Sequence, residues 1–94
     1  MANREFPHDI EAERSLLGAM LISKEKCIDI LNKSVEDDFY DDTHQTIFKA
    51  MSAINEESRP IDVTTVTSYL MDHNQLDKIG GVDYLLRLSE SVPT

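Results

Sequence analysis

The sequence is poor in the residue types that cross-link or anchor a chain. It has one cysteine, Cys27, and no tryptophan among 94 residues. A single cysteine excludes an internal disulfide framework and is typical of a reducing compartment. The apolar run Leu16–Ile22 is far shorter than the ~20 residues of a membrane span, and Met1–Phe6 lacks the basic and apolar regions of a signal peptide. These absences predict a cytoplasmic protein without a membrane segment.

Glycine and histidine are too few and too isolated for the common catalytic and nucleotide-binding motifs. The three glycines cannot form the G-x-x-x-x-G-K-[ST] loop that cradles phosphate groups. His8, His44 and His73 stand apart in the sequence and match no metal-ligand spacing. We therefore predict no catalytic, cofactor-binding or metal-binding residue in this chain, and we interpret His44 as a hydrogen-bonded packing residue.

Basic residues are also scarce, because nine Lys and Arg stand against eighteen Asp and Glu, for a net charge of −9. A surface for nucleic-acid phosphates needs clustered basic side chains, whereas here they are scattered singly. We therefore predict no direct DNA binding by this chain. The acidic field favours a protein partner with basic groups, although solubility alone explains the charge equally well.

What the sequence does contain is a series of short amphipathic helices with clear start signals. Asp9, Ser23 and Asp62 are N-cap residues, and Asp41 or Asp42 favours the start of the central helix. Apolar residues then recur at helical spacing. The predicted helices cover residues 10–22, 24–33, 43–55, 63–73 and 82–91.

The helix at Thr43–Asn55 is predicted to be the centre of the core. Ile47, Phe48, Met51 and Ile54 share one of its faces, which is the stripe of a helix that buries one side. In the first helix, Ile10, Leu17 and Leu21 form the apolar stripe, which Ala12, Leu16 and Met20 widen. The inward positions predicted for the other helices are Cys27, Ile28 and Leu31, then Val63, Val66, Tyr69 and Leu70, and finally Val82, Leu85, Leu86 and Leu88.

Together these elements predict an all-α fold, a compact orthogonal bundle of about five to six short helices. Residues 1–94 are expected to form a single helical domain, with a flexible lead at about 1–8 and a globular head at 9–92. Gly18 lies inside the first helix, where glycine costs about 1 kcal/mol relative to alanine, so it indicates a close helix crossing. The last three residues resemble the start of a new connection, and we expect the chain to be truncated there.

The densest charge cluster is VEDDFYDD at Val35–Asp42. A calcium-binding EF-hand loop needs a glycine at its sixth position, and counted from Asp37 that position is Asp42. The pattern therefore favours a solvated turn whose Phe39 enters the core. Two alternatives stay open at this point: a metal-responsive regulator that uses Asp37–Asp42, and a stand-alone acidic helical adaptor.

Three stretches, in this order, resemble the N-terminal domain of the bacterial replicative DNA helicase of the DnaB type. They are PHDIEAERSLLGAML at Pro7–Leu21, DDFYDDTHQTIFKAM at Asp37–Met51, and the chain from Pro60 to Thr94. The family motifs read P-x-x-x-E-A-E-x-x-[LV]-L-G, D-F-Y-x-x-x-H-x-x-I-F, P-[IV]-D and L-x-x-[IV]-G-G-x-x-Y-L. The matching residues are Pro7, Glu11, Ala12, Glu13, Leu16, Leu17, Gly18, Asp38, Phe39, Tyr40, His44, Ile47, Phe48, Pro60, Ile61, Asp62, Leu76, Ile79, Gly80, Gly81, Tyr84 and Leu85. Asp9 departs from the common serine, but it is also a capping residue.

The resemblance implies a part of a ring-shaped hexamer that uses ATP and Mg²⁺ to unwind DNA from 5′ to 3′ at the replication fork. The motor of that family is a separate domain, absent here, so this chain is expected to have no enzyme activity and no cofactor of its own. The N-terminal domain forms a collar, a trimer of dimers, that supports the ring and takes part in binding the DnaG-type primase. A helicase loader is a further expected partner.

In the family, a helical hairpin follows the globular head and supplies one dimer contact and much of the primase surface. This chain is expected to stop before that hairpin and to be a monomer or a weak dimer. Its partner-binding residues stay unknown at this stage, because the family's contacts cannot be matched to positions present here.

Overall fold

The computed structural model describes residues 9–92, and within this range it contains helices and turns but no β-strand. The elements in chain order are α1 (Ile10–Ile22), α2 (Lys24–Lys33), the 3₁₀ helix η2 (Glu36–Asp38), α3 (Asp42–Glu56), α4 (Val63–Asp72), the 3₁₀ helix η3 (Asp77–Ile79) and α5 (Gly81–Glu90). The predicted all-α fold is confirmed. The flexible lead predicted at residues 1–8 lies outside the described residues.

Four of the five α-helices begin at the capping residue that the sequence indicates. The side chains of Asp9, Ser23, Asp41 and Asp62 each accept a hydrogen bond from a backbone N–H in the first turn of α1, α2, α3 and α4. The first N–H groups of a helix have no partner inside it, so each cap satisfies one otherwise free donor. Thr65 completes the start of α4, because its hydroxyl accepts from the Asp62 N–H at 3.0 Å. Local side-chain chemistry therefore decides where these helices start.

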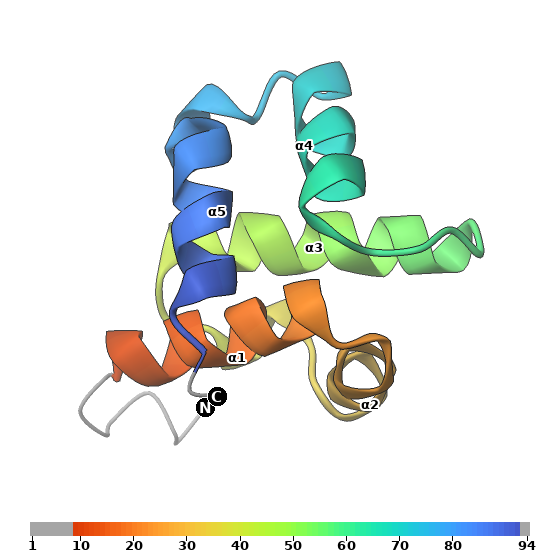
Figure 1. The fold of residues 1–94 in the computed structure, drawn as a ribbon, viewed down its shortest axis with the longest axis vertical. Coiled ribbons are helices and arrows are strands. Elements are labelled where there is room, and N and C mark those ends of the chain that lie inside the picture. Colours follow the sequence, from red (N-terminus) through yellow and green to blue (C-terminus); the bar gives the residue numbers. More distant parts are fainter. Residues whose placement is uncertain (1–8, 93–94) are drawn as a thin grey trace.

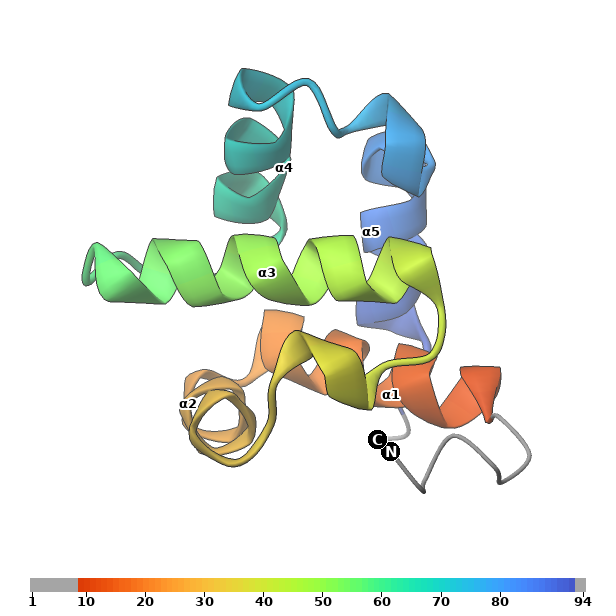
Figure 2. The same cartoon turned by 180° about the vertical axis from the view of Figure 1, so that it is seen from behind.

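The helix α3 runs through the middle of the molecule, and α1 and α4 pack against it (Figure 1). α4 and α5 stand side by side on one side of α3, and α1 lies on its other side. α2 is seen end-on beside α1 in both views (Figure 2). α5 passes α3 and reaches α1, with which it forms the most extensive helix–helix contact. The steep crossings are those of the predicted orthogonal bundle.

The buried face of α3 forms the centre of the core, as its periodicity predicts. Ile47, Met51 and Ile54 have no exposed area, and Phe48 is almost fully covered. Phe39, in the turn before α3, is also buried, and its ring centroid lies 5.1 Å from that of Phe48 with 39° between the planes. Tilted pairs of this kind are favourable for aromatic rings. The acidic turn therefore delivers an aromatic side chain to the core, which confirms the prediction for Phe39.

Three of the predicted inward positions are wrong, and two positions of the widened α1 stripe, Ala12 and Leu16, are also exposed. Ile28, Val82 and Leu86 are 37%, 40% and 43% exposed. In α2, Ile30 packs against the core in place of Ile28. In α5, the covered side faces α1 and α4, and Val82 and Leu86 lie outside it. Spacing defines an apolar stripe, but the neighbouring helices decide which part of a wide stripe is buried.

Two helices and one 3₁₀ turn end in the same left-handed motif. Ser58, Asn74 and Gly80 follow α3, α4 and η3 and have φ values of 60°, 58° and 104°. Each motif is closed by a bond from the next N–H to a carbonyl five positions back, which joins Arg59 to Ile54, Gln75 to Leu70 and Gly81 to Leu76. These bonds satisfy carbonyl groups that a helix end leaves free.

Gly18 lies where α5 comes closest to α1. A Cβ atom at this position would be 2.1 Å from the carbonyl oxygen of Leu88 and 2.7 Å from Cγ2 of Val92. No carbon atom fits at such distances, so the two helices can approach only because position 18 is glycine. The predicted close crossing is confirmed, and it is the crossing of α1 with α5.

Gly18→Ala should destabilise the domain, although the same change in an open helix stabilises it by about 1 kcal/mol. The added methyl group would force α1 away from α5, and overpacking of this kind costs about 1–3 kcal/mol or more. Urea unfolding of the variant measures the sign. Ser15→Ala in the same helix is the matched control and should change the stability by less than about 0.5 kcal/mol. A Gly18→Ala variant more stable than the parent would contradict the close crossing.

Candidate functional site

One cluster of polar side chains inside the fold joins three helices through Glu13 of α1, His44 of α3 and Tyr84 of α5. His44 has no exposed area, and each of its ring nitrogens faces one of the other two residues. Nδ1 lies 2.7 Å from Oε1 of Glu13, and Nε2 lies 2.5 Å from the Tyr84 hydroxyl. The His44 and Tyr84 rings are also stacked, with centroids 5.9 Å apart and 13° between the planes. The three residues form one connected polar unit, the Glu13–His44–Tyr84 cluster.

Glu13 also supports the start of α3 from another helix. Its Oε2 accepts a hydrogen bond from the Tyr40 N–H at 2.6 Å, and its Oε1 accepts from the Asp41 N–H at 3.3 Å. Both oxygens of this carboxyl group therefore act as hydrogen-bond acceptors. The Nδ1–H of His44 therefore donates to Glu13, and in the neutral imidazole Nε2 accepts from the Tyr84 hydroxyl. Every polar atom of the buried ring thus has a partner.

The Tyr84 hydroxyl is suited to remain a donor. Burial raises the pKa of the Tyr84 phenol, and the neighbouring Arg14 guanidinium offsets this only in part. The phenol therefore keeps its proton at neutral pH. Arg14 in turn pairs with Glu11 at the surface, with Nη1 and Oε2 3.1 Å apart. The cluster thus extends from the buried imidazole to a cation at the edge of the fold.

A carboxylate, an imidazole and a hydroxyl in a row are also the components of nucleophilic catalysis. In a catalytic site the hydroxyl must reach a substrate, which needs space beside it. Here the imidazole is fully covered, and other residues line two surface pockets of about 450 and 110 Å³ within residues 9–92. We conclude that the cluster holds helices together. The predicted role of His44 as a hydrogen-bonded packing residue is confirmed.

The acidic residues before α3 are occupied with the backbone of the turn. The Asp38 carboxylate accepts from the Val35 N–H at 2.9 Å, and the Asp41 carboxylate accepts from the Thr43 N–H at 2.8 Å. Across residues 9–92, no three His, Cys, Asp or Glu side chains are grouped so as to hold a metal ion. Two of the aspartates of the predicted solvated turn therefore shape the turn and the helix start.

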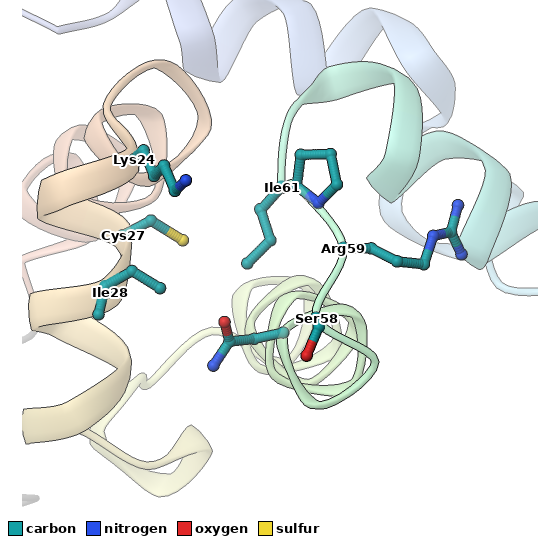
Figure 3. A pocket seen from close by; sticks show the side chains of 8 residues that line it. Lys24, Cys27, Ile28, Ser58, Arg59 and Ile61 are labelled. Atoms are coloured by element: carbon teal, nitrogen blue, oxygen red, sulfur yellow. The ribbon is translucent and has the colours of Figure 1, made fainter.

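A surface pocket of about 450 Å³ lies between α2 and the loop that joins α3 to α4 (Figure 3). Cys27 and Ile28 point into it from α2, and Ile61 faces them from the loop. The Lys24 ammonium group stands at one end, whereas the Arg59 guanidinium group points away. Its volume falls within the range of about 300–1,000 Å³ that is typical of ligand sites. We call this feature the α2–loop pocket.

Neither the partners of His44 nor the α2–loop pocket was predicted from the sequence. In the sequence, Glu13 and Tyr84 stand out only as residues of the family motifs, and neither is predicted to have a role in the core. One signal was present, because Glu13, His44 and Tyr84 each belong to a different stretch of the family motifs. Only one wall of the pocket carried such a signal, since Pro60 and Ile61 belong to a family motif whereas α2 does not. The two walls come from segments about 30 residues apart, and their contact depends on the fold.

The fold and the Glu13–His44–Tyr84 cluster define a small helical scaffold domain. The buried polar groups of this cluster hold helices together, and the α2–loop pocket lies at the surface. Among the helices of residues 9–92, none combines the length and the apolarity needed to cross a membrane. The chain belongs to the family of DnaB-like helicase N-terminal domains, whose sequence model matches residues 5–94. The predicted family is therefore confirmed.

Known relatives agree with this assignment. The chain is 40% identical over 88 residues to the replicative DNA helicase DnaB of Geobacillus stearothermophilus, and 38% identical over 88 residues to the replicative DNA helicase DnaC of Bacillus subtilis strain 168. Each match covers 94% of this chain but only 19% of the relative. The crystal structure of the N-terminal domain of DnaB helicase from Mycobacterium tuberculosis is similar with a TM-score of 0.88 at 39% identity, over 94% of this chain and 61% of that one.

Tyr84→Phe should destabilise the domain by about 1–3 kcal/mol, because it leaves Nε2 of the buried His44 without a partner. The substitution removes one oxygen and keeps the ring that stacks on the imidazole. Urea unfolding measures the loss. Tyr69→Phe, in a partly buried ring that stacks on His73, is the matched control and should cost less than about 0.5 kcal/mol. Equal losses in the two variants would contradict the importance of the buried hydrogen bond.

Cys27 should contribute to stability in a pH-dependent way. It is almost fully covered, and burial raises the pKa of its thiol from 9.0 to about 11. The folded state therefore favours the neutral thiol, so this contribution is complete below about pH 9 and is lost as the pH rises toward 11. Urea unfolding of the parent and of Cys27→Ala at pH 8 and pH 11 measures it. The stability advantage of the parent should shrink at the higher pH, and an unchanged difference would contradict the burial of the thiol.

Proposed function

We propose that this chain is the N-terminal assembly and protein-docking domain of a hexameric replicative DNA helicase. In that protein a separate motor domain uses ATP and Mg²⁺ to unwind DNA from 5′ to 3′ at the replication fork. The observation that carries the proposal is the family match over residues 5–94, together with 38–40% identity to two proteins named as replicative DNA helicases. Because the chain spans 19% of each relative, the proposal assigns it a part in the helicase and not the motor.

The role in this proposal is structural and connective. The domain takes a place in the N-terminal collar of the ring, a trimer of dimers, where its partners are other helicase subunits, the DnaG-type primase and a helicase loader. Two features support a protein-docking role: the net charge of −9, which disfavours contact with nucleic acid, and the α2–loop pocket. The stand-alone adaptor unrelated to helicases is set aside, because the chain belongs to the DnaB-like family.

The isolated chain should hydrolyse no ATP and should bind DNA only weakly at physiological salt. It has no glycine-rich phosphate loop, and its acidic surface repels the DNA backbone. Phosphate release with and without single-stranded DNA tests the first expectation, and fluorescence anisotropy of a labelled oligonucleotide tests the second. The full-length DnaB of Geobacillus stearothermophilus is the positive control. Steady ATP turnover, or tight binding that falls steeply with salt, would contradict the proposal.

The docking role is tested by titrating a DnaG-type primase onto the same chain in isothermal calorimetry, with the full-length helicase as reference. Binding by both proteins supports a contact within this domain. If the full-length helicase binds the primase and this chain does not, the primase contact assigned here is wrong.

A further inference from the structure

The α2–loop pocket differs in chemistry from the rest of the chain. Its walls are mainly apolar, with Cys27 and Ile28 on the α2 side and Pro60 and Ile61 on the loop side. None of its lining residues is Asp or Glu, although the chain has twice as many acidic as basic residues. An apolar hollow without negative charge is therefore set into a strongly acidic molecule.

The charged group directed at this hollow is Lys24. Its side chain extends from α2 toward the loop at one end of the pocket (Figure 3). Within residues 9–92 no carboxylate is paired with Lys24, whereas the ammonium groups of Lys33 and Lys49 each have one within 4.0 Å. Arg59, the other basic residue of the lining, is 3.4 Å from the Glu57 carboxylate and points away from the pocket. Lys24 is thus a cation that is available to an incoming anion.

We propose that the α2–loop pocket docks a segment of a partner protein in which an apolar side chain stands beside a carboxylate. The apolar side chain packs between Ile28 and Ile61, and the carboxylate pairs with Lys24. Ile28 is 37% exposed in the free chain, and such a segment covers it. Burial of apolar area supplies affinity, and the ion pair fixes orientation and partner choice.

The charges of the lining select this occupant. Both charged lining residues, Lys24 and Arg59, are basic, and Arg59 is already paired with Glu57, so Lys24 is the group that favours a segment with a carboxylate. The hollow also lies between a helix and a loop, where an amphipathic segment can lie along the apolar surface. The inference rests on the proposed protein-docking role, but it does not depend on primase or on helicase activity.

The probe is a random peptide display library of about 12 residues, a length that spans three helical turns, panned on the immobilised chain. The enriched peptides should combine a large apolar residue with Asp or Glu at the next position or one turn away. Synthetic copies are then titrated by fluorescence anisotropy. Lys24→Glu should weaken binding about 10-fold, since it replaces a charge-assisted contact by repulsion. Ile28→Ser should weaken binding by a similar factor, because it removes the apolar wall.

Lys26→Glu is the matched control, because it makes the same charge change in the same helix at a residue that does not line the pocket. It should change the affinity less than about 2-fold, as expected of a charge outside the contact. Lys24, Lys26 and Ile28 are all exposed, so the three variants are expected to fold, and circular dichroism verifies this.

Several outcomes would overturn the proposal. Enriched peptides without a carboxylate, equal weakening by Lys24→Glu and Lys26→Glu, or no specific binder at all would each do so. Decanoate distinguishes a small amphiphilic acid from a protein segment, and displacement of the peptide by decanoate at comparable affinity would assign the pocket to the small acid. Enriched peptides that match this chain's own sequence would assign it to a second copy. Each of these results leaves the ATP and primase measurements unaffected, so the two proposals fail separately.

Discussion

The carboxylate of Glu13 is the contact on which the arrangement of the bundle depends. It comes from α1, yet it accepts the N–H groups of Tyr40 and Asp41 at the start of α3 and holds the imidazole of His44. Hydrogen bonds to a charged acceptor contribute about 1.5–3 kcal/mol each, and an unpaired buried donor costs a similar amount. Without Glu13, the Tyr40 and Asp41 amides would lose this acceptor and the core would contain an imidazole that has lost one partner. α1 and α3 therefore cannot move independently.

This contact works together with the close approach at Gly18. Tyr84 reaches His44 from α5, and α5 can lie against α1 only because position 18 carries no side chain. The glycine allows the contact, and the hydrogen-bonded cluster fixes its register, so that packing and polar chemistry select the same helix crossing. A fold in which the two agree has few competing arrangements of similar energy.

The helices themselves could be predicted from the sequence, because their signals are local. Asp9, Ser23 and Asp62 lie next to the helices that they cap, and the stripe around Phe48 repeats within one helix. The candidate site could not be predicted, because Glu13 and His44 are 31 positions apart and His44 and Tyr84 are 40 apart. The left-handed helix ends at Ser58 and Asn74 also escaped prediction, since glycine is the usual residue there.

The residues that carry the family resemblance are, for the most part, those that build the scaffold. Glu13, Gly18 and His44 determine how helices meet, and none of them offers a surface for a partner. The two walls of the α2–loop pocket differ in their relation to the family motifs. Ile61, on the loop wall, belongs to a family motif, whereas α2 lies between the motif stretches. One wall of the pocket is thus tied to the fold, whereas the exposed positions of the other, Lys24 and Ile28, can vary without disturbing it. If the pocket selects a partner, the selectivity resides in α2, where Lys24 supplies the charge.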